Sequence, residues 1–142
     1  MYRYQILVEY VGTNYSGWQI QKKGLTIQGV LQNKISKLLK DKITVVGSGR
    51  TDAGVHATAQ SAHFDCKSLI QNKDKFLKSI NYFLNKKKIA INKKKKKNKN
   101  FHARFSAKER IYKYIIFNQI SASVLNHERG WHITKKLDVK SM

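Results

Sequence analysis

Apolar and polar residues alternate over the first ten positions of the chain. The apolar face carries Tyr2, Tyr4, Ile6, Val8 and Tyr10. A period of two is typical of a strand that is buried on one face only. The sequence therefore predicts a half-buried β-strand over residues 2–11, and the residues from Gly12 to Gly17 that follow are typical of a turn-rich loop.

Two later segments show the helical period instead. Thr26 is a suitable N-cap for a segment whose apolar stripe consists of Ile27, Val30, Leu31, Ile35, Leu38 and Leu39. A second segment, Ser68 to Leu84, places Leu69, Phe76, Leu77 and Ile80 on one face. The pattern predicts helices over residues 26–40 and 68–84.

Short β-branched and aromatic runs predict further strands at Ile43–Val46, Thr58–Phe64, Ile89–Ile91 and Arg110–Asn118. Strands that are interrupted by two helices favour an α+β fold, with a mixed, largely antiparallel sheet and helices on one face. Between the last two strands, residues 92–100 contain five consecutive lysines, Lys93–Lys97. Such a run has no apolar face, so a solvated loop is expected, and phosphate binding is the alternative.

Size and charge narrow the function classes. A chain of 142 residues is long enough for one compact domain. The 29 basic and 8 acidic residues give a net charge of +21, which favours a polyanionic partner such as RNA or DNA over a membrane surface. Because most of the basic residues are lysines, codon usage could explain part of this charge, and the five arginines carry more information.

The sequence offers no signal for a membrane or an oxidising compartment. The longest apolar stretch, Tyr114–Phe117, is far shorter than the roughly 20 residues of a spanning helix. The N-terminus lacks the features of a secretory signal, and Cys66 is a single cysteine. We therefore expect a cytoplasmic protein without disulfides. Residues 137–142 read as the opening of a helix, so we expect the chain to stop within a larger architecture.

Candidate chemistry is concentrated in the glycine-rich segment Gly47–Ala57. It presents Arg50 and Asp52 on a loop that follows a predicted strand, where functional side chains are common. A carboxylate beside a guanidinium can act as a nucleophile or a general base. A structural Arg–Asp ion pair would give the same pattern, so the residues alone leave both interpretations open.

Other candidate side chains have simpler explanations. His56, His63 and Asp65 could suggest a metal site, but no second pair of ligands accompanies them. His102, His127 and His132 are expected to be packing or surface histidines. Trp18 and Trp131 could stack on nucleic-acid bases, although packing within a core or an interface is favoured.

The segment Gly49–His56 reads G-R-T-D-A-G-V-H and resembles the signature of the tRNA pseudouridine synthase A (TruA) family. Three further segments agree in order and spacing: Tyr15–Gln21, Phe101–Ala107 and Tyr112–Tyr114. Asn81 stands where the family has an asparagine before an N-L-P-like stretch, which here lacks the proline. The resemblance covers nearly the whole chain but only the N-terminal half of a typical member.

The resemblance implies a ferredoxin-like fold that forms half of the pseudouridine synthase fold. It also implies isomerisation of uridine to pseudouridine in the tRNA anticodon stem-loop, at tRNA positions 38 to 40, without a metal or redox cofactor. Asp52 would be the catalytic carboxylate. Tyr112 would stack on the flipped base, and Arg50 would pair with Asp52 or occupy the space that the uridine leaves. Arg104, inside the Phe101–Ala107 match, would contact phosphate or pin its own loop.

On this interpretation residues 1–92 form a ferredoxin-like subdomain with a catalytic loop at 47–57. Residues 93–100 form a lysine-rich loop, and residues 101–142 begin a second, truncated half. The resemblance also implies a homodimer, and an uncovered sheet edge would favour self-association. The alternatives are a truncated RNA-binding remnant with weak or no catalysis and, less well supported, a domain that binds some anionic protein.

Overall fold

The computed structural model describes residues 1–142 and divides the chain into two compact units, residues 1–108 and 109–142. The first unit has the order β1 (Tyr2–Tyr10), α1 (Ile27–Leu39), β2 (Val45–Gly47), β3 (Ala57–Cys66), α2 (Lys73–Leu84), η1 (Asn85–Lys87) and β4 (Ile89–Lys97). The second contains β5 (Ile116–Asn118), β6 (Trp131–Ile133) and η2 (Val139–Ser141).

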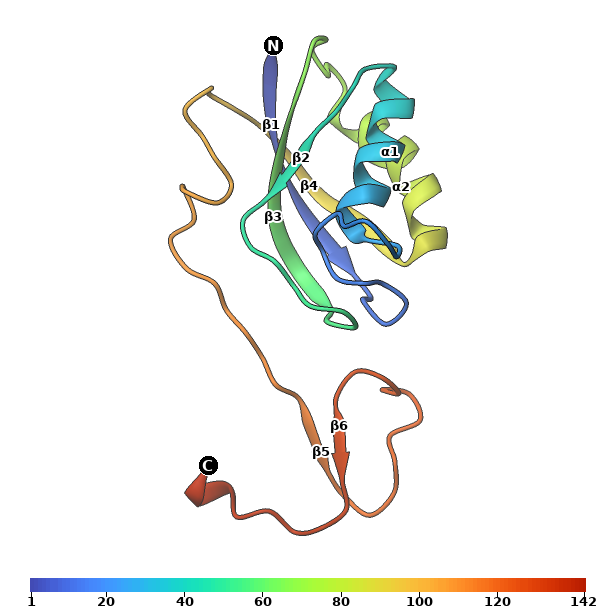
Figure 1. Ribbon diagram of the computed structural model, residues 1–142, viewed down its shortest axis with the longest axis vertical. Helices are drawn as coiled ribbons and strands as arrows, with labels where there is room; N and C mark the ends of the chain where they lie inside the picture. Colours follow the sequence, from blue (N-terminus) through green and yellow to red (C-terminus); the bar gives the residue numbers. More distant parts are fainter. The chain divides into compact units, whose positions relative to one another are not determined.

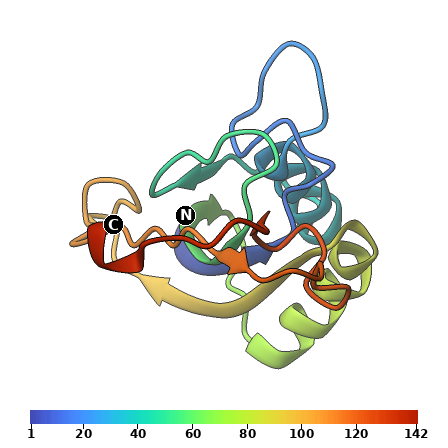
Figure 2. The same ribbon diagram turned by 90° about the horizontal axis from the view of Figure 1, so that it is seen from below.

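The first unit is a split β-α-β sheet. Its four strands lie in the order β2-β3-β1-β4, and every neighbouring pair is antiparallel. Both helices cover the same face of this sheet (Figures 1 and 2). This β-α-β-β-α-β arrangement is the ferredoxin-like one, so the α+β fold class that the sequence predicted is confirmed.

The core lies between the sheet and the helices. Tyr4, Ile6, Val8 and Tyr10 of β1 are buried, as the alternation predicted. The α1 stripe is also confirmed, with Ile27, Val30, Leu31 and Ile35 buried against the sheet. At the start of α1 the Thr26 hydroxyl accepts a hydrogen bond from the Gly29 N–H at 3.3 Å, which satisfies one of the unpaired amides of the first turn.

The second helix begins at Lys73 and not at Ser68 as predicted. Its N-cap is Asn72, whose side-chain oxygen accepts from the Lys75 N–H at 2.8 Å. The preceding residues are held outside the helix because the Ile70 N–H donates to the Tyr4 hydroxyl instead. Leu69 is consequently exposed, whereas Phe76 and Ile80 face the core as expected.

The expected lysine-rich loop is a strand, because β4 extends through Lys97 and pairs with β1 along its whole length. Backbone hydrogen bonding to the free edge of β1 does not depend on side-chain polarity. Lys94 is buried among apolar residues. Its ammonium donates to the Ile70 carbonyl oxygen at 3.2 Å and lies 4.4 Å from the centre of the Tyr4 ring. Burial lowers the pKa of Lys94.

Asn81 joins α2 to this strand. Its amide group donates to the Ile91 carbonyl oxygen at 3.0 Å and accepts from the Ile91 N–H at 2.8 Å. The contact lies where the pairing of β1 with β4 shifts register, between Leu7 and Val8. Because β4 is an edge strand that pairs only with β1, Asn81 satisfies backbone groups of Ile91 for which no further strand is available.

The two outer strands of the sheet are poor templates for pairing with another chain. The β2 edge has only three residues, and the β4 edge is rich in lysine. Antiparallel pairing of two β4 strands would bring ammonium groups together, which disfavours it. Self-association through a sheet edge was expected, but neither edge strand within residues 1–108 is both long and uncharged.

The second unit is small. β5 and β6 form a parallel pair, and the Asn118 side chain donates to the carbonyl oxygens of Ile133 and Lys135. The strand predicted over Arg110–Asn118 is restricted to Ile116–Asn118, because the preceding residues have no neighbouring strand to pair with in this unit. Large apolar side chains are exposed in it, including Ile111, Tyr114 and Leu125.

None of the helices is long and apolar enough to span a lipid bilayer.

Candidate active site

The loop that carries the candidate chemistry connects β2 to β3. Its first residues continue the β2–β3 ladder, since the Ser48 N–H donates to the Ser61 carbonyl oxygen at 2.7 Å. The Gln60 amide then donates to the Gly49 carbonyl oxygen at 2.6 Å. Beyond Gly49 the chain leaves the sheet, and Gly54, with a φ of +81°, allows it to turn back into β3.

A second loop, residues 12–18, braces this segment on both sides of Asp52. Before Asp52, the Thr51 carbonyl oxygen accepts from the Trp18 N–H at 3.0 Å, and the Thr51 hydroxyl lies 2.8 Å from the Tyr10 hydroxyl. After it, the Gly54 N–H donates to the Tyr15 carbonyl oxygen at 3.3 Å. The position of Asp52 is therefore set by backbone contacts between two loops.

His56 adds a third contact to this brace. Its Nδ1 accepts a hydrogen bond from the Gly12 N–H at 3.0 Å. His56 thus holds the end of the catalytic loop against Gly12, the first residue of the loop at 12–18.

Two glycines make this close approach possible. A Cβ at Gly17 would lie 2.6 Å from the Thr51 carbonyl oxygen, and Gly17 has a φ of +93° that other residues rarely adopt. A Cβ at Gly12 would collide with the Val55 carbonyl oxygen. The Tyr15–Gln21 motif is therefore explained by packing of the candidate catalytic loop. The sequence signal that could have shown this role is the pair of glycines, Gly12 and Gly17, in the loop that follows the first strand.

Trp18 lies beneath the loop and not on its surface. Only 2% of its area is exposed, and its ring centre is 6.0 Å from that of Tyr10. The interpretation of Trp18 as a base-stacking residue is wrong, and the favoured interpretation of core packing is confirmed.

Asp52 itself is exposed, in contrast to the backbone around it. Its carboxylate forms no ion pair and no hydrogen bond with another side chain of the protein. Arg50 is also exposed, and no ion pair joins it to Asp52. The carboxylate is thus open to an incoming ligand, and Arg50 is open to one as well.

Arg104 lies on a different part of the sheet. Its segment docks on the face without helices, where the Ala103 N–H donates to His63 Nδ1 at 3.1 Å. His63 is six residues along β3 from Ala57, where the catalytic loop ends, which corresponds to about 20 Å. Arg104 is exposed, with its guanidinium 5.7 Å from the centre of the Phe105 ring. The contact with His63 therefore places the Arg104 segment several residues along β3 from the loop that carries Asp52. Figure 1 shows the chain after β4 and the β2–β3 connection near different ends of β3.

Arg3 is the second anchor of the Arg104 segment, and sequence reasoning did not single it out. Its guanidinium donates twice to Asp65, at 2.8 and 2.7 Å, and also to the carbonyl oxygens of Lys99 and Phe101, each at 2.7 Å. A bidentate pair of this kind is stronger and geometrically more specific than a single hydrogen bond. Arg3 and His63 thus explain why the Phe101–Ala107 motif lies against the sheet. Asp65 and His63, which the sequence suggested as metal ligands, form these contacts within the protein instead.

Tyr112 belongs to the second unit. It lies in an extended segment without secondary structure, and 64% of its area is exposed. Asp52 belongs to the first unit, so the structure relates Tyr112 to Asp52 only through the chain that connects the two units.

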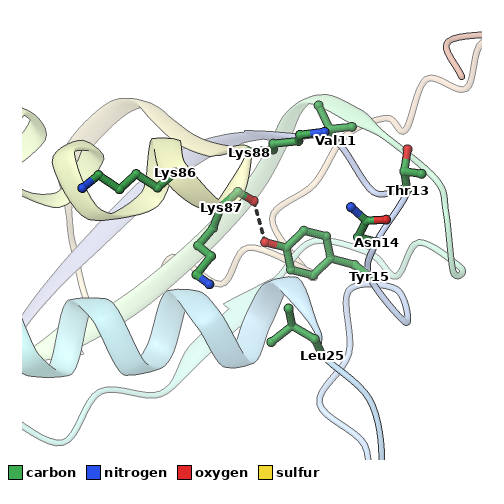
Figure 3. A pocket seen from close by; sticks show the side chains of 8 residues that line it. All are labelled: Val11, Thr13, Asn14, Tyr15, Leu25, Lys86, Lys87 and Lys88. Atoms are coloured by element: carbon green, nitrogen blue, oxygen red, sulfur yellow. Dashed lines mark hydrogen bonds between the residues drawn. The ribbon is translucent and has the colours of Figure 1, made fainter. Parts of the chain in front are cut away.

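A pocket of about 220 Å³ lies beside the bracing loop (Figure 3). It is lined by Val11, Thr13, Asn14, Tyr15, Leu25, Lys86, Lys87 and Lys88. The Tyr15 hydroxyl donates to the Lys87 carbonyl oxygen at 2.5 Å, which ties the loop to η1. None of the candidate residues Asp52, Arg50 and Arg104 lines this pocket.

Burial of His63 makes the stability of the first unit depend on pH. Burial, together with the electrostatic influence of the neighbouring Arg3 and His102, lowers the pKa of His63 to about 4 from the ordinary value of 6.5. Between pH 6.5 and pH 4 the unfolded chain therefore binds a proton that the folded chain does not bind. We expect the free energy of unfolding to fall as the pH decreases through this window, by at most about 3 kcal/mol.

This pH dependence can be measured by urea unfolding at several pH values between 4 and 7. His63→Asn is the matched variant, since its side-chain oxygen can accept from the Ala103 N–H but does not titrate. In the variant the free energy of unfolding should change much less with pH between pH 4 and pH 6.5. The hydrogen bond from Arg3 lowers the pKa of Asp65, so protonation of this carboxylate reduces the free energy of unfolding only at more acidic pH. An equal slope in both proteins would exclude His63 as its source.

The fold and the site together define a class. A ferredoxin-like sheet that presents an exposed aspartate on a braced loop between its second and third strands matches one half of the pseudouridine synthase fold. A sequence profile of the family described as tRNA pseudouridine synthase matches residues 6–106. The chain belongs to the tRNA pseudouridine synthase family.

Two curated relatives agree with this assignment. The chain is 63% identical over all of its 142 residues to a tRNA pseudouridine synthase A of Pelagibacter ubique, of which it covers 58%. It is 44% identical over the same length to a tRNA pseudouridine synthase A of Ruminiclostridium cellulolyticum, of which it covers 57%. The chain thus spans somewhat more than half the length of each relative.

Proposed function

We propose that this chain carries the uridine-isomerising site of a tRNA pseudouridine synthase, with Asp52 as its catalytic carboxylate. The proposed targets are uridines at positions 38 to 40 in the anticodon stem-loop. The observation that carries the proposal is the exposed, unpaired carboxylate of Asp52 on a loop whose backbone is held on both sides. Family membership and the names of the relatives support the substrate class.

The reaction rearranges one nucleotide without gain or loss of electrons. The bond from ribose C1′ to uracil N1 breaks, the base turns, and a new bond forms from C1′ to C5. The proton on C5 leaves, and N1 takes up a proton, so the atoms balance and no redox partner is required. Asp52 either attacks C1′ or removes the 2′ proton first. Both routes need the ionised carboxylate within reach of the ribose.

The other candidate residues would bind the substrate. A target uridine must leave its stacked position, at a cost of a few kcal/mol. Arg50 is exposed and not paired with Asp52, which favours its role in the space that the uridine vacates. Tyr112 would stack on the flipped base and contribute about 1 to 3 kcal/mol. Arg104 would contact a phosphate farther along the RNA.

The proposed assembly is a homodimer in which each tRNA contacts both subunits. The exposed apolar side chains of the second unit, such as Val124 and Leu125, support a covering surface from elsewhere in the complete assembly. The lysine-rich β4 edge disfavours a dimer formed by pairing of that strand.

The proposed function is tested with unmodified tRNA that carries tritium at C5 of its uridines. Because C5 exchanges its hydrogen for the bond to ribose, each turnover releases one tritium to water. We expect release from the anticodon arm, and none from a tRNA in which the target uridines are replaced by cytidines. Binding of tRNA should weaken steeply as the salt concentration rises. Tritium release without dependence on the target uridines would contradict the proposal.

A second candidate function is RNA binding with little or no turnover. It is favoured by the net charge of +21, which gives affinity for a polyanion without requiring any catalytic group. Tight, salt-dependent binding of tRNA without tritium release would identify this function.

A further inference from the structure

Three lysines of β4 project from the sheet face that lies opposite the helices. They are Lys93, Lys95 and Lys97, and we call them the lysine row. Across the ladder they pair with Leu7, Gln5 and Arg3 of β1. Lys94 and Lys96 alternate with them and pair with Ile6 and Tyr4, which belong to the buried helix-facing side.

The lysine row has no compensating acid. None of its three ammonium groups forms an ion pair. The two acids of the neighbouring strands have other partners: Asp65 is held by Arg3, and Glu9 accepts from the Asn92 side chain at 2.9 Å. Lys93 and Lys95 are exposed, and Lys97 is half-buried.

The spacing of the row makes this lack of acids costly. Alternate residues of a strand are about 7 Å apart, which is shorter than the Debye length of about 10 Å at moderate salt. Neighbouring ammonium groups therefore repel each other without full screening. A linear polyanion placed along the strand would remove this repulsion and release its own counterions.

The row also runs into the segment that carries Arg104. The Lys97 ammonium lies 4.8 Å from the centre of the Phe101 ring, and Phe101 docks on the same sheet face through Arg3. Arg104 is exposed three residues later. Lysine row and Arg104 segment thus form one continuous basic track along the edge of the sheet.

We propose that the lysine row binds the phosphate backbone of the tRNA substrate outside the catalytic loop. This inference rests on the proposed function, because it takes tRNA as the polyanion. The row would contribute affinity and orientation without reading the sequence, since ammonium–phosphate contacts are shared by all nucleic-acid sequences. The strand holds the three charges in line, which a solvated loop would not do.

The test compares two triple variants of the full chain that remove the same charge. One replaces Lys93, Lys95 and Lys97 by Gln. The control replaces Lys73, Lys75 and Lys78 by Gln, which are exposed on α2 on the opposite side of the sheet. Binding of unmodified tRNA is measured by filter retention across a range of salt concentrations, and circular dichroism confirms that both variants are folded.

We expect the lysine-row variant to bind at least about tenfold more weakly at low salt. Its slope of log affinity against log salt should be smaller in magnitude by about 2 to 3, since each phosphate contact contributes 0.7 to 0.9. The control should stay close to the unmodified chain. Equal slopes in the two variants would overturn the inference, as would a lysine-row variant that self-associates but binds tRNA normally, because the row would then serve only to protect the edge.

This result separates the inference from the proposed function. If the unmodified chain binds no tRNA, the proposed function fails and the inference fails with it. If the chain binds tRNA and both variants bind equally well, only the inference fails. If the lysine-row variant unfolds, the single substitutions Lys93→Gln and Lys95→Gln replace it, and each should reduce the slope by about 0.7 to 0.9.

Discussion

Replacement of Asp52 by Asn is expected to abolish pseudouridine formation while the protein stays folded. The variant amide can neither attack C1′ nor accept the 2′ proton, and removal of such a group typically lowers turnover at least about a thousand-fold. The Asp52 side chain has no protein partner to lose, so the free energy of unfolding should change by less than about 0.5 kcal/mol. Affinity for tRNA should be equal or slightly higher, because a negative charge is removed.

The measurements are tritium release from tRNA labelled at C5, tRNA binding, and urea unfolding of the same preparations. Asp74→Asn is the matched control, since Asp74 is exposed in the first turn of α2 and loses the same charge. The control should retain full turnover. Turnover by the Asp52 variant within tenfold of the unmodified chain would remove Asp52 from the mechanism.

Replacement of Trp18 by Ala is expected to cause the largest loss of stability. The side chain is buried at the point where α1, β1 and the catalytic loop meet, and its ring lies against Gly47. Truncation of a buried tryptophan to alanine typically costs about 3 to 5 kcal/mol. The backbone N–H of Trp18 donates to the Thr51 carbonyl oxygen. A cavity beneath this contact should therefore loosen the loop beside Asp52.

Urea unfolding measures the loss, and hydrogen exchange of the Gly54 and Val55 amides reports the loosened loop. Trp18→Phe keeps an aromatic ring in the site and should lose less than half as much stability. If the alanine variant lost less than about 1 kcal/mol, Trp18 would not support the loop as the packing indicates.

Sequence patterns were most informative where periodicity and local capping decide the structure. The alternation from Tyr2 to Tyr10 and the stripe that follows Thr26 predicted β1 and α1 because their buried faces repeat at fixed intervals. The order of strands and helices was sufficient for the fold class. Patterns were misleading at Ser68, where a tertiary hydrogen bond to the Tyr4 hydroxyl holds the chain outside the helix.

By itself the sequence determined the α+β class, the first strand and helix, and the loop on which Asp52 and Arg50 stand. The tertiary structure decided that Lys93–Lys97 form a strand, because the free edge of β1 supplies a hydrogen-bonding partner that no local pattern encodes. It also decided the roles of Gly12, Gly17 and His63, whose contacts join segments about 40 residues apart. Such contacts form only when the sheet has assembled, so periodicity along the chain carries no trace of them.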